Sequence, residues 1–145
     1  MAAAAVAMLS AALCLSAGTA PPASVATMAT TQFTLRWQHS IEKIAWEEDY
    51  VVAGDWLLLS GARIRGSGAG MEPPPDAVLQ GGVWHYRVAN PWRRSLVLAR
   101  SEFVRDYELC VHAICQPLSH WIPVAAGTTT LQACTAQHGP ATPTP

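Results

Sequence analysis

FTLRWQHSIEKIAWEEDYVV, residues 33–52, is the stretch that decides the fold. At its start the apolar side chains of Phe33, Leu35 and Trp37 alternate with polar ones, which is the period-two pattern of a half-buried strand. A corner at residues 39–43 interrupts the pattern and carries a His, a Ser and the chain's only Lys. The alternation then resumes, so the stretch predicts two strands joined by a polar corner.

The second of these strands has two distinct sides. Tyr50 and Val52 share its apolar side, and Glu47 and Asp49 lie on the other. Glu48 falls on the apolar side, which predicts either a polar partner or a position at a strand edge.

Further strand-like runs follow along the chain. Gly and Pro residues separate them, and no window outside the N-terminal segment has a helical period. We therefore expect an all-β fold, a small antiparallel β-sandwich or partly open barrel of six to eight short strands. The runs after residue 52 cover residues 56–65, 83–88, 95–99, 107–112 and 118–123, the last of these as a strand or a packed loop.

Both ends of the chain lack charge, because every Lys, Arg, Asp and Glu lies between Arg36 and Glu108. Residues 1–20 are predicted to be a secretory signal peptide, although no basic residue follows Met1. We expect a linker at 21–31, a β-domain at 32–123, and a low-complexity, partly disordered tail at 124–145. The protein is thus expected to be exported and periplasmic, with residues 1–20 either cleaved or retained as an inner-membrane tether.

Export into an oxidising compartment favours disulfide bonds. Removal of the signal leaves Cys110, Cys115 and Cys134, so that two cysteines pair and one is left over. A short bridge from Cys110 to Cys115 and a longer one from Cys115 to Cys134 both remain open. The same region suggests a zinc set of Cys110, Cys115, His112 and His120, but its spacing matches no known finger, so no metal or other cofactor is expected.

A net charge of -1 gives no electrostatic case for a nucleic-acid partner. The corner at 39–43 and the glycine-rich loop at 66–70 are the two stretches where reactive or unusual residues gather. The loop could cradle an anion with its backbone N–H groups, but a proline run follows it where a phosphate loop needs a helix.

The order of these motifs resembles a family of small exported bacterial proteins known as domain of unknown function 1850, over residues 33–122. The resemblance is carried by the sequences FxLxWxHSIEK (33–43), WxExY (46–50), GSGAGME (66–72) and Leu109-Cys110. Members of that family are typically encoded beside TAXI-type TRAP transporters, which import small carboxylates with a periplasmic solute-binding protein. The resemblance implies a non-enzymatic accessory whose partner is the transporter permease or the TAXI solute-binding protein.

An alternative role is a module that binds a small organic anion, or hydrolyses it, at the corner and the glycine loop. Hydrolysis is disfavoured, since neighbouring residues on a strand point to opposite faces and His39 cannot easily activate Ser40. No catalytic residue is therefore predicted. The candidate ligand-binding residues are His39, Ser40, Glu42, Lys43, Glu48, Arg63, Arg65, Gly68 and Gly70.

Overall fold

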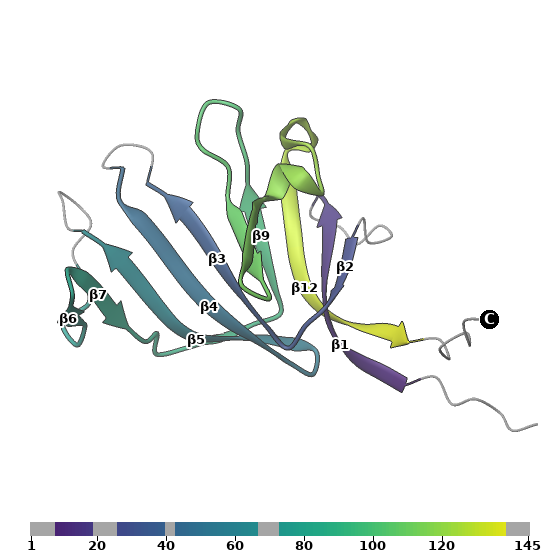
Figure 1. The fold of residues 1–145 in the computed structure, drawn as a ribbon, viewed down its shortest axis with the longest axis horizontal. Coiled ribbons are helices and arrows are strands. Elements are labelled where there is room, and N and C mark those ends of the chain that lie inside the picture. Colours follow the sequence, from purple (N-terminus) through teal and green to yellow (C-terminus); the bar gives the residue numbers. More distant parts are fainter. Residues whose placement is uncertain (1–7, 19–25, 40–42, 67–72, 139–145) are drawn as a thin grey trace, which may run out of the picture.

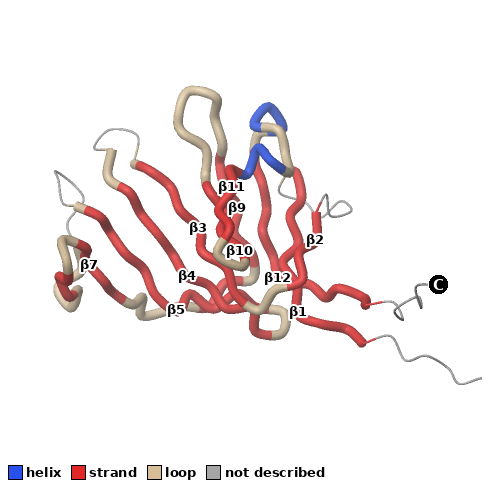
Figure 2. Tube along the Cα trace, in the orientation of Figure 1, coloured by secondary structure: helices blue, strands red, loops and turns tan. Residues whose placement is uncertain are grey.

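The computed structural model describes residues 8–18, 26–39, 43–66 and 73–138. These residues form twelve β-strands and two short 3-10 helices, η1 (Leu118–His120) and η2 (Val124–Ala126). The strands make two antiparallel sheets that face each other as a sandwich and are not closed into a barrel (Figures 1 and 2). The predicted all-β sandwich is therefore confirmed, and the barrel alternative is not.

The larger sheet contains residues 33–52, which decide the fold. Its strand order is β11-β10-β3-β4-β5-β7-β6, with β8 paired to β5. Neighbours β3, β4 and β5 form a continuous meander, in which Trp37 lies opposite Trp46 and Trp46 opposite Ile64. The strands are β3 (Gln32–Gln38), β4 (Ala45–Ala53), β5 (Trp56–Arg65), β6 (Val78–Gln80), β7 (Val83–Tyr86), β8 (Trp92–Arg93), β10 (Glu108–Val111) and β11 (Ile114–Pro117).

The smaller sheet joins the two ends of the described chain. Its order is β2-β1-β12-β9, and β1 and β12 pair along ten residues of register. In Figure 1 this sheet lies at the opposite end of the molecule from β6 and β7. Its strands are β1 (Met8–Ala17), β2 (Ala26–Ala29), β9 (Ser95–Ala99) and β12 (Thr128–His138).

The main core lies between the two sheets. Phe33 and Leu35 from β3, with Tyr50 from β4, pack against Leu13 and other residues of the smaller sheet. Because side chains alternate across a strand, the residues between these apolar ones face away from the core, as the sequence pattern predicts. The other buried residues of this core are Leu15, Val52, Leu57, Leu59, Leu98, Leu109, Leu118, Ile122 and Leu131.

The domain extends beyond the predicted boundaries of 32 and 123. The expected linker contributes β2, and the expected low-complexity tail contributes η2 and β12. The expected signal peptide contributes β1, in which Leu13 and Leu15 are fully buried. Prediction of a tail at 124–138 was wrong because buried Thr129 and Thr130 look, in sequence, like the residues of a polar tail. Cleavage after Ala20 remains a prediction, and it conflicts with the place of β1 in the sheet.

Within the described ranges, neither helix is long and apolar enough to cross a membrane.

Two disulfides each link neighbouring strands within one sheet. Cys110 pairs with Cys115 across the β10–β11 hairpin, as one of the two open alternatives predicts. Cys134 pairs with Cys14, so the expected leftover cysteine is wrong, because Cys14 had been assigned to a removable signal. The described chain has no free cysteine.

Mild reduction should open the two disulfides in a fixed order. Cys115 is exposed at the surface, whereas Cys14 is only 6% exposed inside the small sheet. A thiol reductant needs direct access to one sulfur, so the Cys110–Cys115 bond should be reduced first. Stepwise alkylation followed by mass spectrometry measures this order, and loss of both bonds at the same rate would contradict it.

Arg100, at the end of β9, forms a buried ion pair that connects the two sheets. Its side chain is fully buried and donates from Nε and Nη2 to the two carboxylate oxygens of Asp106, at 2.8 Å each. Its Nη1 donates to the carbonyl of Ile122 and to the hydroxyl of Thr129, both at 2.9 Å. This arrangement fixes the chain between β9 and β10 against η1 and β12.

Candidate functional site

The polar corner predicted from sequence is the turn of the β3–β4 hairpin. The N–H of His39 donates to the carbonyl of Ile44 at 2.9 Å, and the N–H of Lys43 donates to the carbonyl of His39 at 3.0 Å. Lys43 has a φ of 57°, a left-handed conformation that suits a tight turn. Ser40 and Glu42 lie outside the described residues, so their predicted binding role stays a prediction.

The glycine-rich loop leaves the large sheet at the same end as this turn. Arg65, the last residue of β5, pairs with Ala45 at the start of β4. A Cβ on Gly66 would lie 3.6 Å from the side chain of Ile44, so the loop begins in contact with the hairpin. Gly68 and Gly70 lie outside the described residues.

Six charged side chains form a network on the side of the large sheet that faces away from the core. We call this surface the charged face, and it includes Arg36, Glu47, Asp49, Arg63, Arg65 and Glu108. Its residues come from four neighbouring strands, β10, β3, β4 and β5. In the register, Glu47 lies directly opposite both Arg36 and Arg63, where opposite charges stabilise a sheet.

Glu47 is the centre of the charged face. It is 5% exposed and interacts with Nε of three arginines: Arg63 at 2.8 Å, Arg65 at 3.0 Å and Arg36 at 3.3 Å. Burial alone would raise the pKa of Glu47, but hydrogen bonds from Arg65 and Arg63 outweigh it and lower the pKa. Glu47 is therefore ionised at neutral pH and keeps all three guanidinium groups in place.

Asp49 extends the network along β4. Arg63 donates to both of its carboxylate oxygens, and the hydroxyl of Thr34 donates to Oδ1 at 2.7 Å. The hydrogen bond from Arg63 lowers the pKa of Asp49, and burial opposes this shift. An ionised carboxylate with a lowered pKa is a poor general base, so the nearby Thr34 is not activated as a nucleophile.

Glu48 faces the opposite side of the sheet, toward the core. Its carboxylate accepts a short hydrogen bond from the hydroxyl of Tyr50. Burial raises the pKa of Glu48, and the hydrogen bond from Tyr50 and the charge of Arg93 only partly offset this. Of the two explanations that the sequence left open for Glu48, the polar partner is the one found.

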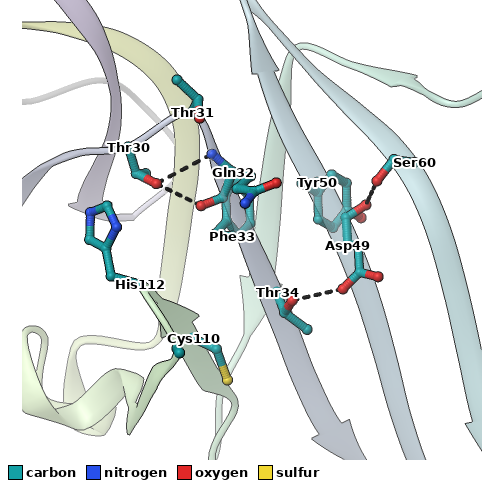
Figure 3. Close-up of a pocket in the computed structure, with 11 residues that line it drawn as sticks. Thr30, Thr31, Gln32, Phe33, Thr34, Asp49, Tyr50, Ser60, Cys110 and His112 are labelled. Carbon is teal, nitrogen blue, oxygen red and sulfur yellow. Dashed lines mark hydrogen bonds between the residues drawn. The ribbon is translucent and has the colours of Figure 1, made fainter.

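A polar hollow of about 410 Å³ lies beside the charged face, near the β10–β11 hairpin (Figure 3). Several hydroxyl groups line it, but most already bond to neighbouring protein atoms. The hydroxyl of Thr30 donates to the carbonyl of Gln32 at 2.6 Å, and that of Ser60 donates to the carbonyl of Asp49 at 3.1 Å. Figure 3 shows these groups turned toward the backbone around them. The hollow therefore offers few unsatisfied groups to a ligand.

Of the predicted ligand-binding residues that the structure describes, Glu48 lies apart from the others. Arg63 and Arg65 lie on the charged face and are ion-paired. Glu48 lies on the other side of the same sheet, and His39 and Lys43 lie in the turn. Arg36, Glu47, Asp49 and Glu108 were not predicted as site residues, although the alternation that places Arg36, Glu47 and Asp49 on one side of β3 and β4 is visible in the sequence.

The zinc alternative is excluded by the cysteines themselves. Cys110 and Cys115 are joined in a disulfide and have no thiolate to offer a metal. Among the described residues there is also no cluster of three or more His, Cys, Asp or Glu side chains placed to hold a metal ion.

The fold and this surface define a disulfide-bonded β-sandwich domain whose candidate site is an open sheet face. The chain belongs to the family described as domain of unknown function (DUF1850), whose model matches residues 33–118. The matched residues begin inside β3 and end in η1, so β1, β2 and β12 lie outside the match. No curated protein and no solved structure matches the chain.

Proposed function

We propose that this chain is an exported, non-enzymatic accessory domain of a TAXI-type TRAP transporter for small carboxylates. We further propose that it contacts the permease or the TAXI solute-binding protein through the charged face. The association with a transporter is what the sequence resemblance implies, and the chain's membership of the DUF1850 family agrees with that resemblance. Two disulfides support a role in an oxidising compartment.

The main support for the charged face as a protein-binding surface is that its arginines are already ion-paired. Arg36, Arg63 and Arg65 already have carboxylate partners within the sheet. A free organic acid would have to displace Glu47, which is buried and held by all three. The same pattern suits a protein partner, because fixed charges of alternating sign provide orientation and specificity at an interface.

The location of the charged face also favours contact with a protein partner. The smaller sheet packs on the opposite side of β3, β4 and β5, so no described strand covers this face. Exposure increases toward the rim, from 7% for the side chain of Glu47 to 50% for that of Arg65. A partner would therefore contact Arg65 and Arg36 first, with Glu47 holding them in position.

Co-purification tests this proposal. The tagged full-length chain is expressed together with the permease and the solute-binding subunit of a TAXI-type TRAP transporter from the same genome. We expect one of them to co-purify, and we expect Arg65→Ala to reduce its recovery severalfold, as loss of a charge at an interface rim slows association. Arg87→Ala is the matched control, because Arg87 is exposed and outside the charged face.

Two outcomes would contradict the proposal. Recovery of neither subunit, beside a known interacting pair as positive control, would remove the transporter role. Calorimetry that shows a small carboxylate binding to the isolated chain, with the binding lost in Arg65→Ala but not in Arg87→Ala, would instead support the organic-anion module. Thermal unfolding of both variants confirms that they are folded.

A further inference from the structure

A second surface on the large sheet has chemistry unlike the charged face. Beyond a β-bulge between Asp49 and Tyr50, the outward side of β5 becomes apolar and aromatic. Trp56 is 36% exposed there, and Trp92 of β8 is 47% exposed. Leu57 and Leu59, between the outward residues of β5, are buried in the core. Two exposed indoles on adjacent strands are a large amount of aromatic surface to leave in water.

The two indoles form a corner, with no slot between them. Their ring centroids are 6.4 Å apart and their planes meet at 76°, so the edge of one ring contacts the face of the other. Together with Asn90 they line an open hollow of about 520 Å³. A hollow of this shape suits a compact ring that lies on one indole face with its edge toward the other indole.

The loop that carries this corner is fixed by the protein. The guanidinium of Arg93 donates to the carbonyls of Asn90 and Trp92, at 2.6 and 2.9 Å. The N–H of Leu59 donates to the carbonyl of Pro91 at 2.8 Å, and β8 pairs with β5 at Trp92 and Leu58. The corner is therefore held in place before any ligand arrives, which lowers the entropic cost of binding.

The polar groups around the corner have hydrogen-bonding capacity left over. Arg94 stacks over the ring of Trp56, with Cζ at 4.1 Å from the centroid. None of the ion pairs between described residues includes Arg94, so no carboxylate of the described residues neutralises its charge. The side-chain amide of Asn90 makes no hydrogen bond within the described chain, which leaves both a donor and an acceptor for a ligand.

We propose that Trp56, Trp92, Asn90 and Arg94 form a binding site for an acidic sugar ring, a saccharide unit that carries a carboxylate. The C–H face of such a ring stacks on an indole, its hydroxyls bond to the Asn90 amide, and its carboxylate pairs with Arg94. An anionic membrane fits this surface less well, because the site is hollow, the net charge of the chain is -1, and lipid recognition needs a cluster of several basic residues. This site is independent of the proposed function and uses no residue of the charged face.

Calorimetry with trigalacturonate, an acidic trisaccharide, tests the site on the full-length oxidised protein. Cellotriose serves as a neutral sugar of similar size. We expect trigalacturonate to bind more tightly than cellotriose, and Trp92→Ala to weaken both roughly tenfold, as removal of a stacking platform does for other ring ligands. Trp92→Phe, which keeps an aromatic face, should restore part of the lost affinity.

Two further variants isolate the charge. Arg94→Gln should remove the preference for trigalacturonate over cellotriose, whereas Arg87→Gln, at an exposed arginine outside the site, should leave it unchanged. Raising the salt concentration should reduce the same preference.

Three results would overturn the proposal. The first is no binding of trigalacturonate at millimolar concentration, and the second is binding that Trp92→Ala and Arg94→Gln leave intact. The third is binding of phosphatidylglycerol vesicles, or a concentration-dependent dimer in sedimentation, that Trp92→Ala abolishes while no sugar binds. Thermal unfolding of each variant establishes that it is folded before its affinity is compared.

Discussion

Replacing Asp106 by Ala should lower the free energy of unfolding by about 3–5 kcal/mol, the usual cost of breaking a buried ion pair at one partner. The reason is the position of Arg100, whose side chain is 0% exposed and donates two hydrogen bonds to the carboxylate of Asp106. In the variant this guanidinium stays buried without a counter-ion. The N–H of Ser119, which donates to Asp106 at 2.8 Å, also loses its acceptor. Urea denaturation followed by circular dichroism measures the change.

A matched control lies one residue away. Arg105 pairs with Glu108 at 3.4 Å, but its side chain is 67% exposed. Arg105→Ala should change the free energy of unfolding by less than about 1 kcal/mol, as is usual for surface pairs. If Asp106→Ala and Arg105→Ala lower the free energy of unfolding equally, the buried pair stabilises the fold no more than a surface pair does.

The buried pair also predicts how stability changes in acid. Burial alone would raise the pKa of Asp106, but hydrogen bonds from Arg100 and the Ser119 N–H outweigh it and lower the pKa. A carboxyl whose pKa is lower in the folded state contributes stability above its unfolded pKa of about 4, and this contribution is lost as the pH falls through the folded pKa. The lowered pKa values of Glu47 and Asp49 also make the folded state less stable in acid. The raised pKa of Glu48 has the opposite effect on stability. Between pH 7 and pH 3, Asp106→Ala should therefore lose less stability than the wild-type protein.

The central meander was predictable because its signal is local. Phe33, Leu35 and Trp37 alternate with polar residues, and the same period places Glu47 and Asp49 on the side away from the core. Once β3 and β4 are joined by a short corner, register puts Arg36 opposite Glu47. This part of the charged face could therefore have been predicted from the sequence, although only Arg63 and Arg65 were named as candidate residues.

The buried ion pair has no local signal. Asp106 follows Arg100 by six residues, but the other groups that hold the guanidinium come from Ile122 and Thr129. Only the packing of η1 and β12 brings them together. A sequence pattern cannot distinguish this arginine from one on the surface.

The aromatic corner was missed for a different reason. An exposed tryptophan and a core tryptophan look alike in sequence. Pairing of β8 with β5 decides the matter by placing Trp92 beside Leu58 on the outward side of the sheet. β5 and β8 are far apart in the sequence, and no periodic pattern of apolar residues indicates that they pair.

The N-terminal strand was concealed by its composition. In β1 one side of the strand carries Leu13 and Leu15, and the alternate residues Ala12, Cys14 and Ser16 are small and are buried as well. Without charged residues on alternate positions the period-two signal is weak, and such an apolar run is typical of a signal peptide.

Deletion of residues 1–20, the product of the predicted signal cleavage, should prevent the remaining chain from folding. β1 lies between β2 and β12, so its loss leaves two separated strands with unpaired backbone groups at their edges. The fully buried side chains of Leu13 and Leu15 leave the core with it. A chain of 21–145 should accordingly show no cooperative unfolding transition.

Removal of the disulfide between Cys14 and Cys134 is a milder test of the contribution of β1 to stability. Cys14 and Cys134 are 120 residues apart in sequence, and in the chain-entropy model a cross-link over so long a loop stabilises a fold by about 4–5 kcal/mol. Cys14→Ser should lower the free energy of unfolding by an amount of this order. Cys115→Ser is the matched control, because its bond closes a separation of only 5 residues and so restricts the unfolded chain far less.

The mass of the mature protein shows whether residues 1–20 are cleaved or β1 is retained in the small sheet. If β1 belongs to the working domain, protein purified from the envelope fraction without reductant retains residues 8–17 and carries both disulfides. A mature chain that begins at Pro21 and still unfolds cooperatively would show that the sandwich does not need β1. Cys134 would then be left without its partner, which alkylation of the unreduced protein would detect as one reactive thiol.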